Sequence, residues 1–142
     1  MNVYEAKQVA HKERLGSKAF RDAYVEKHLH TWIAYQIKTI REQRQWSQAE
    51  LAQRANKPQS VVSRLENPDY GRFTLRTLMD LASAFDVALL VKFVPFSELA
   101  GRNLDLSPAA MQVVEFVHDH GFSGEGRQDV RSGRFPVLGA GA

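Results

Sequence analysis

One stretch limits what this chain can fold into more than any other: SQAELAQRANKPQSVVSRLEN, residues 47–67. Its apolar positions fall on one face of each of two short helices, and the break at Asn56-Lys57-Pro58 separates them. Helices of about eight residues are marginal in water on their own. The two halves must therefore be held by tertiary packing, and so short a break forces them to cross at a steep angle.

Local signals set the ends of these two helices. Ser47 and Glu50 have the S-x-x-E spacing of a capping box, which starts the first helix. Asn56 tolerates a left-handed backbone and suits the end of that helix. Pro58 suits the restart, because its missing N–H would be unpaired there in any case, but it offers no side-chain cap.

The two faces of the second helix differ in chemistry. Val62 and Leu65 face inward and share a core with Leu51 of the first helix. The outward side chains are all hydrogen-bonding groups: Lys57, Gln59, Ser60, Ser63 and Arg64. This is the arrangement of a helix-turn-helix, whose second helix fits the major groove of DNA.

The pattern Q-x-E-L-A, followed without a gap by Q-S-x-x-S-R-L-E-N, resembles the Cro/repressor-type (XRE) helix-turn-helix regulators. The resemblance covers about residues 38–87, including TLRTLMDLASAFDV, and departs from the family where Asn56 replaces the usual glycine and Pro58 the usual cap. It implies that Gln59, Ser60 and Arg64 face base edges. It also implies that Gln48 and Asn67 contact phosphates.

Side-chain chemistry agrees with that reading. Arginine can bond guanine at two points and glutamine can do the same for adenine, while Ser63 can bond bases or phosphates. Residues 38–76 hold eight basic and four acidic side chains, so this segment alone exceeds the net charge of +3 of the whole chain. The phosphate contacts are expected from Lys38, Arg41, Arg44, Lys57 and Arg72.

The rest of the chain is expected to be mainly α-helical, a helical bundle with one short C-terminal β-strand. Residues 1–30 are expected to form a helical arm and residues 31–87 the DNA-binding domain. Apolar residues repeat along one helical face over residues 17–45, as one helix or as two with a joint near His30. Trp46 is expected to pack under the two short helices.

Beyond residue 87 the pattern changes to ALLVKFVPF, which is β-branched, aromatic and stopped by Pro95. We expect a strand at residues 88–94, within a dimerisation segment 88–100. A lone strand needs a partner, and its copy in a second subunit is the obvious one, with Leu89, Val91 and Phe93 at the interface. Residues 101–142 are expected to be partly helical, over 107–121, and then a disordered glycine-rich tail.

Other classes of protein find little support in the sequence. The chain has no cysteine, which excludes disulfides and thiolate chemistry. Two H-x-H pairs, at residues 28–30 and 118–120, would point to different faces of a helix and chelate poorly. No catalytic frame or phosphate-binding loop occurs, so we expect no enzyme, no metal and no cofactor. No apolar run reaches the roughly 20 residues of a bilayer span, and we expect a cytoplasmic protein.

The sequence therefore predicts a sequence-specific regulator that binds double-stranded DNA as a homodimer, most simply a repressor. One alternative is the antitoxin of a toxin–antitoxin module, which represses its own operon and binds a toxin. Another is a protein-interaction module in which DNA binding is secondary.

Overall fold

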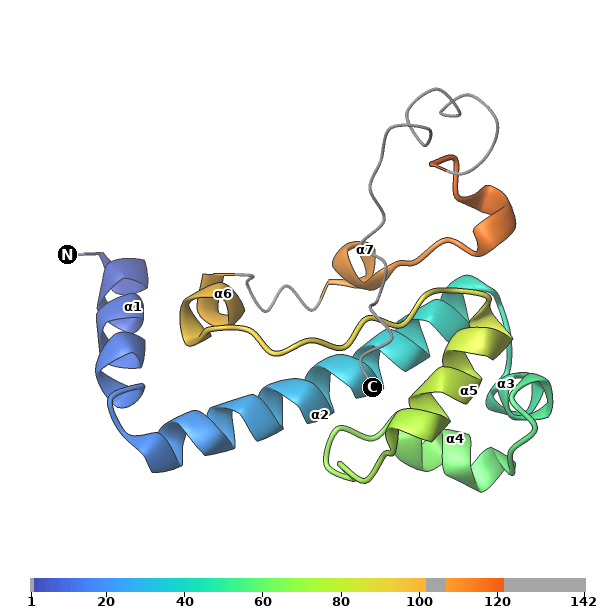
Figure 1. Cartoon of the computed structure of the whole chain (residues 1–142), viewed down its shortest axis with the longest axis horizontal. Coiled ribbons are helices and arrows are strands. Elements are labelled where there is room, and N and C mark those ends of the chain that lie inside the picture. The colour runs from blue at the N-terminus through green and yellow to red at the C-terminus, as the bar shows by residue number, and fades with distance from the viewer. Residues whose placement is uncertain (1, 102–106, 122–142) are drawn as a thin grey trace, which may run out of the picture.

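The computed structural model describes residues 2–101 and 107–121. Two long helices, α1 (Val3–Arg14) and α2 (Lys18–Gln43), meet at a sharp bend, as Figure 1 shows. Three helices gather at the far end of α2: α3 (Gln48–Arg54), α4 (Gln59–Leu65) and α5 (Leu75–Phe85). The chain then returns alongside α2 to α6 (Phe96–Gly101) near the arm. The last described elements are α7 (Pro108–Met111) and a 3-10 turn, η1 (Phe116–His118).

Helix α2 is one continuous helix. Ser17 caps its start, where the Ser17 hydroxyl accepts a hydrogen bond from the backbone N–H of Phe20, and the helix runs unbroken past His30. The predicted boundary between residues 30 and 31 thus lies inside α2, and the arm and the DNA-binding segment share this helix. Side chains of the arm hold α1 in place, since the His11 ring packs edge-on against Tyr24 at 4.9 Å.

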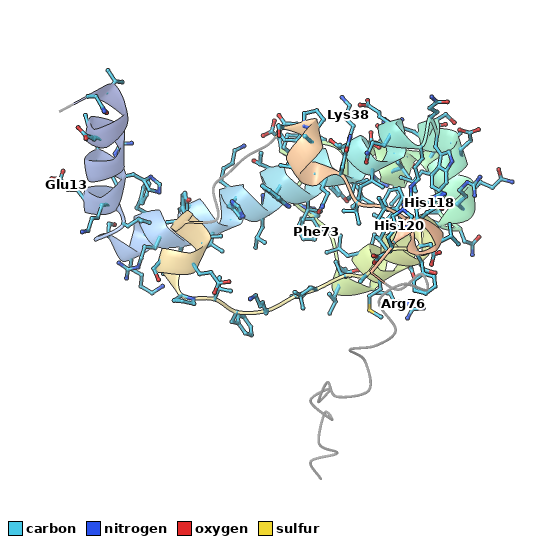
Figure 2. All side chains as sticks on the ribbon, turned by 90° about the horizontal axis from the view of Figure 1, so that it is seen from above. Glu13, Lys38, Phe73, Arg76, His118 and His120 are labelled. Carbon is cyan, nitrogen blue, oxygen red and sulfur yellow. The ribbon has the colours of Figure 1, made fainter. Side chains whose placement is uncertain are left out.

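The main core lies where α2–α5 meet. Leu51 and Val62 are fully buried there, and Ile37, Ile40, Leu65, Leu81 and Phe85 surround them. A second contact joins α7 to the outer side of α2, where Met111 is completely buried. Figure 2 shows Lys38 and Arg76 pointing outward at opposite edges of this end of the molecule. No helix of the described residues is both long and apolar enough to cross a bilayer.

Three expectations for the C-terminal half need correction or stay open. The predicted helix over 107–121 is wrong beyond Met111. The adjacent Val113 and Val114 disfavour a helix, and the N–H of Phe116 donates to the carbonyl of Asp86 instead of closing a helical turn. No strand is present in residues 2–101 and 107–121, so the strand at 88–94 is unconfirmed. The predicted tail after Gly121 lies outside the described residues.

Three helices end in the same way. Gln45, Asn56 and Asp86 have positive φ angles of 56°, 52° and 54°. In each case the next residue's N–H bonds back to a carbonyl five residues earlier, as Lys57 does to Ala52 at 2.8 Å. The left-handed turn predicted at Asn56 is therefore confirmed. The tightness of the break between α3 and α4 depends on it.

Gln45 is the least suited of the three to a left-handed backbone, because it lacks the short polar side chain of asparagine or aspartate. We predict that Gln45→Gly raises the free energy of unfolding by about 0.5–1 kcal/mol. Gln43→Gly, two residues earlier in helical backbone, should lower it by about 1 kcal/mol. Urea unfolding followed by circular dichroism compares the two, and a Gln45→Gly protein no more stable than wild type would contradict the account.

Candidate nucleic-acid interface

The start of α3 is fixed by the predicted capping box. The hydroxyl of Ser47 accepts from the N–H of Glu50 at 3.1 Å, and the Glu50 carboxylate accepts from the N–H of Ser47 at 2.6 Å. The start of α4 differs, since Pro58 precedes it and makes no side-chain cap. The first N–H groups of α4 are thus left without that partner, at the end of the helix where anions bind.

The outer face of α4 is exposed and polar. Gln59, Ser60, Ser63 and Arg64 are all solvent-exposed, as predicted, while Val62 and Leu65 hold the opposite face in the core. A hydrogen-bonding face of this kind on a short, well-anchored helix can enter a groove without rearranging the domain.

The side chain of Arg64 is held along α4. Its Nε donates to the carbonyl of Ser60 at 3.2 Å, and its guanidinium lies 5.7 Å from the ring centre of Tyr70. These contacts limit the rotamers of Arg64, which reduces the entropy lost when it binds a base. Tyr70 was not among the predicted site residues, because nothing in the sequence shows that the turn after α4 folds back onto it.

Beneath this face lies a buried network of charged and polar groups. Glu66, at the C-terminus of α4, is 9% exposed. Its carboxylate accepts from Arg41 Nε and Nη2 at 2.5 and 3.0 Å and from Gln48 Nε2 at 3.0 Å. Arg41 also donates to the carbonyl of Trp46 at 2.8 Å. The network connects α2, α3 and α4. The hydrogen bond that Arg41 donates to the Glu66 carboxylate is the main cause that raises the pKa of Arg41.

Several predicted phosphate ligands are engaged inside the protein. Arg41 and the amide of Gln48 belong to the buried network. Arg44 donates to the carbonyl of Phe85 and lies over the rings of Trp46 and Phe85. The structure thus gives Arg41 and Arg44 structural partners in place of the predicted phosphates. The sequence could not show this, since each partner lies on another helix.

Lys57 is also paired within the protein. Its ammonium lies 2.9 Å from the carboxylate of Asp80, which Arg76 approaches at 3.3 Å. The hydrogen bond from Lys57 is the main cause that lowers the pKa of Asp80. This pair ties the break before α4 to α5, so Lys57 is not on the open face with Gln59.

Other predicted phosphate ligands lie at the surface. Lys38 is exposed, with Glu42 at 4.0 Å, and Arg72 is exposed as well. The side-chain oxygen of Asn67 accepts from the N–H of Asp69 at 2.9 Å, which leaves its NH₂ group as the donor for an anion. Arg54, which was not predicted, is exposed on α3 with its guanidinium 4.1 Å from the ring centre of Trp46.

The comparison with protein families decides the identity of this segment. Residues 37–91 match the family described as Helix-turn-helix. Residues 37–91 are a DNA-binding helix-turn-helix domain. The match supports the Cro/repressor-type resemblance and includes α3, α4 and α5. No curated protein and no solved structure shows significant similarity to the chain.

Trp46 and His30 pack around the helix-turn-helix segment. Trp46 packs against the core, as predicted, and its ring stacks on that of Phe85 with ring centres 6.0 Å apart. His30 packs edge-on against Phe73 and closely over Gly71, where a Cβ would approach the ring to 2.4 Å. Within the described ranges, no three histidine or acidic side chains gather as metal ligands would.

The buried network generates a stability prediction. Arg41→Met leaves the Glu66 carboxylate buried without its countercharge, and should lower the free energy of unfolding by about 3–5 kcal/mol. Arg41→Met combined with Glu66→Leu removes both charges and should recover most of that loss. Urea titrations measure the free energy of unfolding of the wild type and of each variant.

Arg72→Met is the matched control, because Arg72 is exposed, and it should change stability by no more than about 0.5 kcal/mol. An Arg41→Met protein that loses less than about 1 kcal/mol would show that Arg41 is a surface arginine in solution, free to contact phosphate.

Proposed function

We propose that the protein is a dimeric, sequence-specific transcriptional repressor in which α4 reads the major groove. The observation that carries this proposal is the outer face of α4, where four exposed hydrogen-bonding side chains lie on a helix anchored from behind. Gln59 and Ser60 lie in its first turn, the part of a recognition helix that approaches base edges. Arg64 lies one turn further along the same exposed face.

The proposed division of labour follows from exposure and pairing. Arg64 reads guanine and Gln59 reads adenine, with Ser60 and Ser63 beside them. Asn67, Lys38 and Arg72 contact phosphates and set the orientation of the domain without reading sequence. The start of α4, which has no side-chain cap, leaves N–H groups that suit a further phosphate contact.

Dimerisation through residues 88–94 is the second part of the proposal. Leu89, Val91 and Phe93 are exposed to 41%, 66% and 107%, which a monomer in water would not favour. A two-fold dimer would present two copies of α4 to half-sites about 34 Å apart, or a multiple of one helical turn. Where such an operator overlaps a promoter, its occupation excludes the polymerase, so repression needs no further surface on the protein.

The readout can be tested by selecting DNA sites from a random pool with wild type and two variants. Arg64→Ala should cost about 1–3 kcal/mol of binding free energy and relax the preference at one base position in each half-site. Arg72→Ala should weaken binding to all sequences by a similar factor and leave the preference intact. An Arg64→Ala protein that selects the wild-type site unchanged would show that α4 is not in the groove.

A further inference from the structure

The backbone of segment 88–94 has no hydrogen-bond partner within the described residues, and its large apolar side chains Leu89, Leu90, Val91 and Phe93 are exposed. Within residues 2–101 and 107–121, no hydrogen bond joins its N–H and C=O groups to another part of the chain. In Figure 1 it runs as an elongated trace from the end of α5 towards α6. A row of unpaired backbone groups on an apolar segment is a template for a second strand.

The side chains of this segment alternate in character. Leu89, Val91 and Phe93 are apolar and, in an extended chain, share one side. Leu89 and Val91 border a hollow of about 430 Å³ beside α5, whose other walls include Leu75 and Met79, themselves 56% and 50% exposed. Phe93 follows Val91 by two residues and does not line this hollow, and the Phe93 side chain is fully exposed.

Symmetry restricts how a second copy can pair. If both strands lie with Leu89, Val91 and Phe93 towards the two α5 helices, the two-fold axis is perpendicular to the ribbon and passes through a pair of identical residues. Centring the pair on Val91 keeps the whole of 88–94 paired. Leu89 is then opposite the partner's Phe93, because directly opposed residues lie on the same side of the ribbon.

We propose that two copies of this chain pair antiparallel through residues 88–94 with Val91 against Val91, and that each Phe93 covers the hollow beside the partner's α5. The occupant is a second copy because the apolar row is self-complementary: reversed about Val91, it again presents three apolar side chains. A two-stranded ribbon is marginal alone, and the apolar backing from Leu75 and Met79 supplies the burial it needs. The inference rests on the dimer of the proposed function and gives it a register.

The other side of the ribbon accepts the same register. Leu90 lies opposite the partner's Lys92, whose ammonium lies 3.2 Å from a Glu98 carboxylate oxygen of its own chain. The methylene stem of lysine packs on an apolar neighbour while its charge stays in water.

The register can be tested with single cysteines, because the chain has none of its own. Val91→Cys should form a disulfide-linked dimer on mild oxidation, since the two Cβ atoms lie about 4.5–5.5 Å apart in a directly opposed pair. Leu89→Cys should not, because the two copies lie four residues apart along the ribbon, about 13 Å. Leu89→Cys combined with Phe93→Cys should link the subunits again. Non-reducing gels score the products, with no DNA present.

Each result separates the inference from the proposed function. If sedimentation shows a dimer while Val91→Cys fails to form a disulfide, or while Leu89→Cys forms one as readily, the register is overturned but the proposed dimer is left intact. A protein that is monomeric at tens of micromolar overturns both. Loss of DNA binding alone leaves the pairing intact, since the cross-links form without DNA.

A second measurement tests the hollow. Phe93→Ala and Met79→Ala should each raise the dimer dissociation constant, Phe93→Ala by at least about a hundredfold. The loss of dimerisation free energy in the double variant should be smaller than the sum of the two single losses, because the two side chains contact each other across the interface. Val117→Ala, at an exposed apolar residue outside the segment, is the control and should not change it. If the two single losses of dimerisation free energy add up in the double variant, Phe93 does not contact the partner's Met79 and the proposed place of Phe93 is wrong.

Discussion

The ion pair between Arg41 and Glu66 is the interaction on which the rest of the DNA-binding domain depends. It joins the long helix α2 to the end of α4, and the amide of Gln48 adds the start of α3 to the same carboxylate. Burying two charges is costly, and the cost is offset only when most of their hydrogen-bonding capacity is used. Here the carboxylate receives three donors and the guanidinium also reaches the Trp46 carbonyl, so the network holds three helices in one arrangement.

This arrangement separates the basic residues into two groups. Arg41, Arg44 and Lys57 are occupied by the carboxylate of Glu66, the carbonyl of Phe85 and the carboxylate of Asp80, and they fix the positions of the helices. Arg64 and Arg72 remain at the surface. Net charge therefore overstates the number of cations available to DNA, because these three basic side chains are already paired within the protein.

Features of the fold that are local in sequence could be predicted, and those that depend on distant partners could not. Ser47 with Glu50, the left-handed Asn56 and the uncapped start at Pro58 all follow from residues within one turn of each other. The roles of Arg41 and Lys57 depend on partners 25 and 23 residues away, which no local pattern reveals. The exposed face of α4 was predicted from spacing alone, whereas its contact with Tyr70 was not. The antitoxin and protein-interaction alternatives stay predictions, since no contact in the described residues favours either.

The most direct test of the account is to map the DNA-contacting surface by NMR, using ¹⁵N-labelled protein and a duplex selected from a random pool. The account predicts that the amide signals of residues 59–64 and of Asn67 shift most on addition of DNA, with smaller shifts at the start of α3 and none in α1. Unchanged signals in α4, with the main shifts in α1 or in α7, would contradict it, because the buried network would then be holding a face that DNA never meets.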